Sequence, residues 1–168
     1  DGKRFLVMEW LDGCDLGEYL NENETLSIQD TLRLAEQVAL ALGRAHKRGI
    51  IHRDIKPSNI FLLHNDPAQI RVLDFGIARL ARPSQWLTRP GVVIGSPGYM
   101  APEQARGDMQ LSPRADIFSL GCVVYHALVG ESPFYAAAET AVLAKILFSD
   151  APRARHSRPD VPPMLDNL

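Results

Sequence analysis

Hydrophobic positions repeat with helical spacing in one long segment near the start of the chain. Ser27 precedes this segment and Asp30 follows three residues later, a weak form of the residue pair that caps a helix N-terminus. Gly49 marks its end, as a helix C-terminus often requires. The pattern predicts a helix within residues 27–49, and its expected apolar face comprises Ile28, Leu32, Ala35, Val38, Ala39, Leu42 and Ala45.

Two more helices are expected further along the chain. Pro113 follows Ser112 at a typical helix start, and the apolar run behind it continues to Gly130. Residues 136–148 are rich in alanine and predict a third helix. Residues 81–113 contain several prolines and little periodicity, so they predict a long loop, a feature that is usually functional. After residue 151, prolines and arginines predict an extended surface segment.

Short apolar runs predict strands at three places. Residues 5–8 read as a buried strand that Asp12 and Gly13 end. Residues 60–63 and 70–73 flank a turn-rich link and predict a hairpin.

The hairpin also carries a prediction about register. Symmetric pairing about the link would place Ile60 opposite Leu73 and, one step further out, Asn59 opposite Asp74. Opposed residues in such a ladder have Cα atoms about 5 Å apart. The hairpin is therefore expected to bring an amide and a carboxylate together at its open end.

The composition is that of an ordinary globular protein. Of 168 residues, 46% are hydrophobic and 23% are charged, and the formal net charge is -2, which excludes a disordered or collagen-like chain. The near-neutral charge gives no electrostatic reason to expect a nucleic acid or an anionic membrane as partner. Cys14 and Cys122 show no disulfide or metal pattern, and Cys122 is expected in the core. We expect an α+β protein, rich in helix, in the reducing cytoplasm.

No apolar run in the chain is long enough to cross a bilayer, so we expect no membrane segment within it. The chain begins at Asp1 without a signal-like start, which favours a fragment of a larger parent protein.

The strongest chemical signal lies at residues 52–59, which read His-Arg-Asp-Ile-Lys-Pro-Ser-Asn. Asp-Phe-Gly follows at residues 74–76 and Ala-Pro-Glu at residues 101–103. A lone Asp-Phe-Gly is usually a turn, but this combination in this order is the signature of protein kinases. The chain therefore resembles the eukaryotic-like (Hanks-type) serine/threonine protein kinases, and residues 95–107 are most similar to bacterial members.

The resemblance covers residues 1–168 as a partial kinase domain that holds the hinge, the catalytic loop, the activation segment and the central helices of the C-lobe. It implies a protein-kinase-like fold, made mainly of this helical lobe with a small β hairpin. The glycine-rich loop and its partner lysine, which belong to the N-lobe, are absent from the 168 residues. We therefore expect the isolated chain to bind ATP poorly and to transfer no phosphate.

The resemblance also assigns catalytic roles. Asp54 would orient the substrate hydroxyl and accept its proton, and Lys56 would place a cation near the moving phosphoryl oxygens. Asn59 and Asp74 would offer oxygen ligands to Mg²⁺. These roles imply transfer of the γ-phosphoryl group of ATP to serine and threonine hydroxyls of proteins. His52 is expected to hold the loop rather than to act as a base.

On the adenine side, the resemblance implies that the backbone of Glu9 and Leu11 pairs with the base. Met8 would form the back wall of the pocket and Phe61 would cover one face of the adenine. Asp15 would reach the ribose or a substrate side chain; the alternative is that it only begins a solvated helix.

Three residues are implied in regulation. Arg53 would bind a phosphate on Thr88, because a guanidinium beside the catalytic aspartate suits a phosphorylated loop. Ser96 would hydrogen-bond Lys56 and Asp54 and shape the substrate site.

Two alternatives remain open at this point. A pseudokinase would keep the fold as a binding scaffold, although the complete set of base and metal residues argues against it. A small-molecule phosphotransferase of related fold would act on other alcohols, but Lys56, the Ala-Pro-Glu motif and the long loop favour protein substrates.

Overall fold

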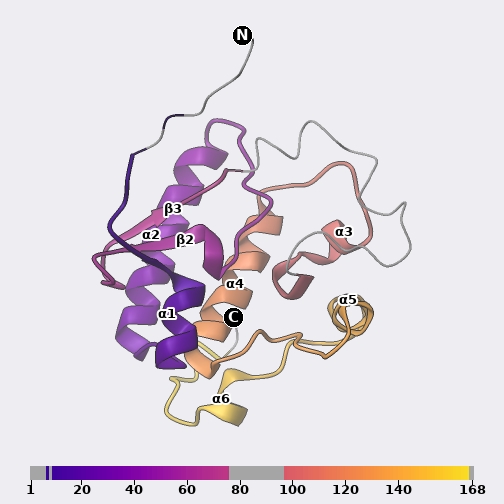
Figure 1. The fold of residues 1–168 in the computed structure, drawn as a ribbon. Helices are drawn as coiled ribbons and strands as arrows, with labels where there is room; N and C mark the ends of the chain where they lie inside the picture. Colours follow the sequence, from indigo (N-terminus) through magenta and orange to yellow (C-terminus); the bar gives the residue numbers. More distant parts are fainter. Residues whose placement is uncertain (1–6, 8, 76–96, 167–168) are drawn as a thin grey trace.

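Helices dominate the part of the chain that the computed structural model describes, which is residue 7 and residues 9–75 and 97–166. Figure 1 shows helix α4 near the centre, with α1, α2 and a small sheet on one side of it and α3 and α5 on the other. The elements in chain order are β1 (Gly13–Asp15), α1 (Leu16–Asn23), α2 (Ile28–His46), the 3₁₀ turn η1 (Pro57–Asn59), β2 (Ile60–Leu63), β3 (Ile70–Val72), the 3₁₀ turn η3 (Pro97–Tyr99), α3 (Pro102–Ala105), α4 (Arg114–Val129), α5 (Glu139–Phe148) and α6 (Ala154–Ser157).

Helix α2 begins where the sequence predicts. Ser27 is its N-cap, and its Oγ accepts a hydrogen bond from the backbone N–H of Asp30 at 3.0 Å. The side chain of Thr31 is fully buried, and its Oγ1 donates to the carbonyl of Ser27 within the helix, which satisfies its polar atom. The helix ends at His46, and Gly49 follows with a φ of 73°.

The buried face of α2 differs from the predicted one. Val38 and Leu42 are buried as expected, but Leu32 is 45% exposed and Ala39 is also exposed. Leu34 takes the place of Leu32 in the core and is 0% exposed. The buried positions 31, 34, 38 and 42 follow the same helical spacing on a stripe that is rotated around the helix relative to the predicted one.

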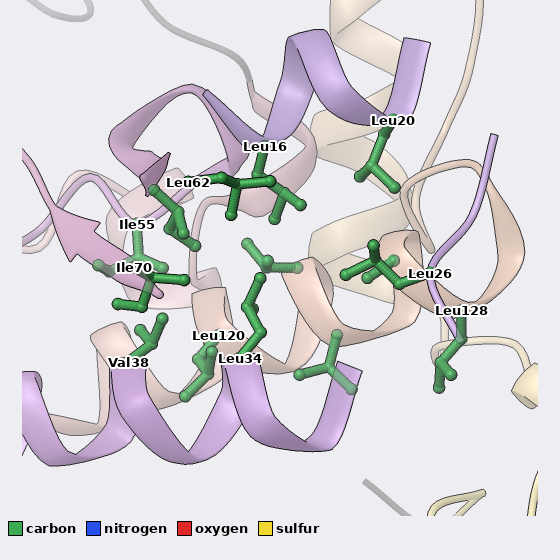
Figure 2. Packing of buried hydrophobic residues seen from close by; sticks show 14 of the residues in the cluster. Leu16, Leu20, Leu26, Leu34, Val38, Ile55, Leu62, Ile70, Leu120 and Leu128 are labelled. Atoms are coloured by element: carbon green, nitrogen blue, oxygen red, sulfur yellow. The ribbon is translucent and has the colours of Figure 1, made fainter. Parts of the chain in front are cut away.

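The main hydrophobic core lies between α1, α2, α4 and the sheet. In Figure 2, Leu16 and Leu20 of α1 point toward Leu34 and Val38 of α2, while Leu120 comes from α4. The fully or almost fully buried members of this core are Leu16, Leu20, Leu26, Leu34, Val38, Leu42, Ile55, Ile60, Leu62, Ile70, Leu120, Val123, Val124, Ala127, Leu128, Ala154 and Val161.

Replacing Leu34 with alanine is expected to lower the free energy of unfolding by about 2–5 kcal/mol, because it leaves a cavity in a fully packed core. Leu32→Ala removes the same atoms from the same helix at an exposed position, so it is expected to cost less than about 1 kcal/mol. Urea unfolding of the full-length variants measures both. Equal losses would contradict the assignment of the buried face.

The sheet has three antiparallel strands in the order β1-β2-β3. Strands β2 and β3 form the predicted hairpin, although β3 ends at Val72, one residue early. Strand β1 was not predicted: it follows Asp12, where the sequence indicates only the end of an earlier strand. Gly13 opens β1 with a φ of 135°, and a Cβ at this position would overlap the carbonyl oxygen of Leu62.

The predicted hairpin register is wrong by one residue. Ile60 lies opposite Val72, and the N–H of Leu73 donates to the carbonyl of Asn59 at 2.9 Å, so Asn59 faces Leu73 rather than Asp74. The cause is an asymmetric turn in which His64 and Asn65 both have positive φ. The N–H groups of Asn65 and Asp66 bond back to β2, so the chain reverses sooner than a symmetric link would allow.

Helix α4 confirms the predicted apolar helix. It runs from Arg114 to Val129, and Gly130 ends it in the left-handed conformation with a φ of 95°. Cys122 is buried, as expected. The ten-residue α5 begins at Glu139, so the predicted start at residue 136 is wrong by three residues.

Two predicted irregular segments contain short helices. The turn η3 and the helix α3 lie within the expected long loop, whose residues 81–96 fall outside the described part, and α6 interrupts the expected extended segment after residue 151. Of the strand expected at residues 5–8, only Val7 is described; it is exposed and belongs to no strand.

The fold class is nevertheless confirmed: a mainly helical α+β domain with a small sheet. Within the described ranges, no helix has the length and apolar character that a membrane span requires.

Candidate active site

The segment at residues 52–59 joins α2 to β2 and begins with a completely buried histidine. The ring of His52 donates from Nε2 to the carbonyl of Leu73 at 2.7 Å, and its Nδ1 accepts the backbone N–H of Asp54 at 3.3 Å. The ring centroids of His52 and Phe75 are 4.7 Å apart. Burial lowers the pKa of His52, which keeps the ring neutral and Nδ1 able to accept. Both nitrogens are thus occupied in holding the loop, which supports the expected structural role.

Asp116 in the first turn of α4 anchors the same loop from the other side. Its carboxylate is completely buried and accepts the backbone N–H groups of Arg53 at 2.7 Å (Oδ1) and His52 at 2.8 Å (Oδ2). Oδ2 also lies 2.7 Å from Nε2 of His46 at the end of α2. Arg53 has a φ of 68°, a conformation that costs a non-glycine residue about 1–3 kcal/mol and persists only where its surroundings impose it. Asp116 is one of the groups that impose it.

The three residues expected to be catalytic meet at the end of this loop. Oδ2 of Asp54 lies 3.1 Å from Nζ of Lys56 and accepts a hydrogen bond of 3.1 Å from Nδ2 of Asn59. Nδ2 of Asn59 also donates to the main-chain carbonyl of Asp54 at 2.7 Å. The structure thus brings the predicted trio together, with one carboxylate oxygen held between an ammonium and an amide.

Asn59 and Asp74 lie at the same end of the hairpin without facing each other directly. Asn59 is 7% exposed and ends the turn η1, whereas Asp74 is exposed and has a φ of 51°. Both hydrogen bonds described for the Asn59 side chain use Nδ2, so its Oδ1 is the atom that would face a ligand. The described residues contain no cluster of three or more His, Cys, Asp or Glu side chains that could hold a metal.

This pair fits Mg²⁺ as part of a shared site. Proteins commonly hold Mg²⁺ through one or two carboxylate or amide oxygens, while substrate phosphates and water supply the other ligands. Asn59 and Asp74 provide such oxygens, and joint binding of Mg²⁺ by the two residues stays a prediction.

The residues expected on the adenine side are only partly brought together. Asp15 and Phe61 lie opposite each other in the β1–β2 pair. Glu9 is exposed and Leu11 is half-buried, both before β1, and Met8 lies outside the described residues. Asp15 also has a clear local role as N-cap of α1, where its Oδ1 accepts the N–H of Glu18 at 2.9 Å. Nucleotide binding by these residues stays a prediction.

The regulatory residues are also untested. Thr88 and Ser96 lie outside the described residues, and the described contacts of Arg53 involve its backbone groups. Their roles in control by phosphorylation stay predictions.

The sequence interpretation missed two residues that hold the loop. It predicted the helix that contains Asp116 but gave this residue no role in the loop, although a carboxylate in a mostly apolar helix could have signalled a buried anchor. It gave Gln104 no role, although Nε2 of Gln104 donates to the carbonyl of Arg53 at 2.9 Å. No local sequence pattern identifies a contact between residues so far apart in the chain.

Comparison with known proteins shows the family of the chain. The family model described as "Protein kinase domain" matches residues 1–163. The chain is 38% identical to the serine/threonine-protein kinase pkn3 of Myxococcus xanthus, over 100% of the chain and 32% of the relative. It is 38% identical to PrkC of Bacillus subtilis, over 98% of the chain and 25% of the relative. It is 39% identical to PknB of Mycolicibacterium smegmatis, over 96% of the chain and 26% of that relative.

These relatives are all bacterial serine/threonine-protein kinases by name, which confirms the expected bacterial type. The chain spans about a quarter to a third of their length. The match over residues 1–163, together with the Asp54, Lys56 and Asn59 cluster, identifies the chain as a member of the protein kinase domain family.

Proposed function

We propose that the protein transfers the γ-phosphoryl group of ATP to serine and threonine hydroxyls of proteins, with Asp54 as the base. The observation that carries this proposal is the position of Asp54 Oδ2, 3.1 Å from both Lys56 Nζ and Asn59 Nδ2. The names of the relatives support the reaction class. Asp54 would accept a hydrogen bond from the substrate hydroxyl, orient its oxygen and take the proton as the new bond to phosphorus forms.

Lys56 supplies a fixed positive charge beside this carboxylate. Its side chain is 20% exposed, so its ammonium can contact Asp54 and still reach a bound phosphoryl group. In the loose transition state of phosphoryl transfer, negative charge is spread over the peripheral oxygens, and a positioned cation stabilises it.

Asn59 and Asp74 are the residues that would hold Mg²⁺. The protein kinase family generally uses ATP and Mg²⁺, and the bound ion would neutralise charge on the phosphate oxygens. The amide of Asn59 has a second task, because its Nδ2 holds the side chain and the carbonyl of Asp54 while its oxygen would face the metal.

The direct test is transfer of label from γ-labelled ATP by the full-length protein in the presence of Mg²⁺. We expect phosphoserine and phosphothreonine in a generic basic protein, and no label when the metal is chelated. Transfer only to small alcohols would favour a small-molecule phosphotransferase. Absence of transfer with retained binding of partner proteins would favour the pseudokinase alternative.

Removing the metal ligand at position 59 is expected to change the Mg²⁺ requirement. Asn59→Ala should raise the Mg²⁺ concentration for half-maximal activity by about tenfold, equivalent to about 1.4 kcal/mol of lost affinity, and should also lower the maximal rate because Asp54 loses its amide contact. Titration of activity with Mg²⁺ measures both effects. Ser58→Ala, at the exposed neighbouring position, is the control and should leave the titration unchanged. An unaltered titration in Asn59→Ala would mean that Asn59 does not bind the metal.

A further inference from the structure

The peptide group between Arg53 and Asp54 is held at both of its polar atoms. Its carbonyl oxygen, on Arg53, accepts a hydrogen bond from Nε2 of Gln104 at 2.9 Å. Its N–H, on Asp54, donates to Nδ1 of His52 at 3.3 Å. Rotation of this peptide would break both hydrogen bonds and would turn the side chain of Asp54.

The contact of Gln104 comes from a different part of the fold than the other anchors of the loop. His52 belongs to the loop itself and Asp116 to α4, whereas Gln104 lies on α3, 51 residues away from Arg53 in sequence. Helix α3 packs against both α4 and α5, which gives the Gln104 side chain a fixed base.

The amide of Gln104 is itself oriented by a second hydrogen bond. Its Oε1 accepts the backbone N–H of Ala101 at 3.1 Å, so the oxygen is engaged at the start of α3 and Nε2 is directed at Arg53. An amide is required for this arrangement, because one end accepts and the other end donates. Glutamate can replace the acceptor but not the donor.

The conformation of Arg53 makes this contact consequential. With a φ of 68°, Arg53 is in the left-handed region that non-glycine residues rarely adopt. Asp116 holds the N–H of Arg53 and Gln104 holds its carbonyl, so two side chains from two helices fix the residue that precedes Asp54.

We propose that Gln104 is a positioning residue of the catalytic loop, which sets the peptide before Asp54 and couples helix α3 to the base. The proposal rests on the proposed function, in which Asp54 receives the substrate proton. Helix α3 lies within the long loop predicted at residues 81–113, so any shift of α3 would change the hydrogen bond from Gln104 to the peptide before Asp54.

The test compares Gln104→Glu and Gln104→Met in the full-length protein with the matched control Gln37→Glu. Gln37 on α2 has the same bonding pattern, since its Nε2 donates to the carbonyl of Ala68 at 3.0 Å and its Oε1 accepts the N–H of Ile70 at 3.4 Å, away from the catalytic loop. Gln104→Glu keeps the Ala101 contact and removes only the donor. Gln104→Met removes both contacts without adding a charge. Comparing it with Gln104→Glu therefore separates the effect of the lost hydrogen bond from the effect of the added negative charge.

We expect both Gln104 variants to lower kcat by about 10- to 100-fold, because a small misplacement of a catalytic group has effects of this size. The KM for ATP should stay within about twofold of the wild-type value, since the nucleotide contacts are not altered. Gln37→Glu should leave kcat unchanged. An unchanged kcat in both Gln104 variants, or an equal loss in Gln37→Glu, would overturn the proposal.

Hydrogen exchange supplies a readout that does not depend on activity. Gln104→Glu should speed exchange of the backbone amides in residues 52–56, whereas Gln37→Glu should speed exchange only around residues 68–70. Unchanged exchange at residues 52–56 would also overturn the proposal. If the wild-type protein transfers no phosphate, the proposed function fails, and the exchange measurement still decides whether Gln104 holds the loop.

Discussion

Replacing Asp54 with asparagine in the full-length protein is expected to lower the rate of phosphate transfer by about 100- to 10,000-fold, the contribution typical of a positioned base. An amide has the shape of the carboxylate but cannot take the proton of the substrate hydroxyl. The loop should keep its conformation, because Asn59 Nδ2 also holds the main-chain carbonyl of residue 54 at 2.7 Å. The KM for ATP should therefore change little, and the loss should fall on kcat.

The matched control for this variant is Asp66→Asn. Asp66 lies in the turn between β2 and β3, where its carboxylate accepts the N–H of Ala68 at 2.8 Å and the amide of Gln69 at 2.9 Å. The same chemical change at this position should leave kcat at the wild-type value. Label transfer from γ-labelled ATP, with circular dichroism as the test of folding, separates the two variants. A folded Asp54→Asn protein with wild-type kcat would show that another group accepts the proton.

Elements with strong local signals could be predicted from the sequence. Helices α2 and α4 have an apolar repeat and clear ends, with Ser27 as a cap and Gly130 in the left-handed conformation. Their existence follows from local physical chemistry. Local physical chemistry does not determine which face of α2 is buried. Leu32 and Leu34 are equally apolar, and only the position of the neighbouring elements selects which one is buried.

Short elements were missed because their stability comes from tertiary contacts. Strand β1 has three residues and exists through its pairing with β2. Helix α1 was predicted only as the alternative role of Asp15, that of beginning a helix, although the sequence also contains the Asp15 and Glu18 capping box and the apolar Leu16 and Leu20. In a segment of eight residues, such a pattern does not distinguish a helix from a loop.

The candidate site likewise has features that the sequence predicts and features that only the fold reveals. The cluster of Asp54, Lys56 and Asn59 could be predicted because the motif places all three within six residues. The residue that lies opposite Asn59 could not be predicted, because the turn after Leu63 shifts the register by one residue and places Leu73 there in place of Asp74. The anchors Asp116 and Gln104 lie more than 50 residues in sequence from the loop residues that they contact, and only the fold brings them together.

Asp116→Ala should produce the largest combined loss of stability and activity among the residues that support the site. The substitution removes the acceptor of two backbone donors, the buried N–H of His52 and the part-buried N–H of Arg53. Each buried donor left without a partner costs about 1–3 kcal/mol, so the free energy of unfolding should fall by about 2–6 kcal/mol. Asp116→Asn should cost about half as much, because an amide keeps one accepting oxygen.

The control is another buried carboxylate that contacts no catalytic residue. The side chain of Asp166 is 6% exposed, compared with 1% for Asp116, and it accepts the backbone N–H of Arg155 at 2.9 Å. Asp166→Ala should therefore lower stability while leaving kcat unchanged.

Activity is measured under conditions in which both Asp116→Ala and Asp166→Ala remain folded. This separates a loss of stability from a displacement of Asp54. Without Asp116, Arg53 loses a group that imposes its φ of 68°, and relaxation of Arg53 moves the following residue, Asp54. We therefore expect kcat of folded Asp116→Ala to fall by about 100-fold, in line with the cost of displacing a catalytic group by about 1 Å. Urea unfolding gives the stability of each variant, and label transfer at a temperature well below both unfolding transitions gives kcat. Equal kcat values for Asp116→Ala and Asp166→Ala would mean that Asp116 stabilises the fold without positioning the base.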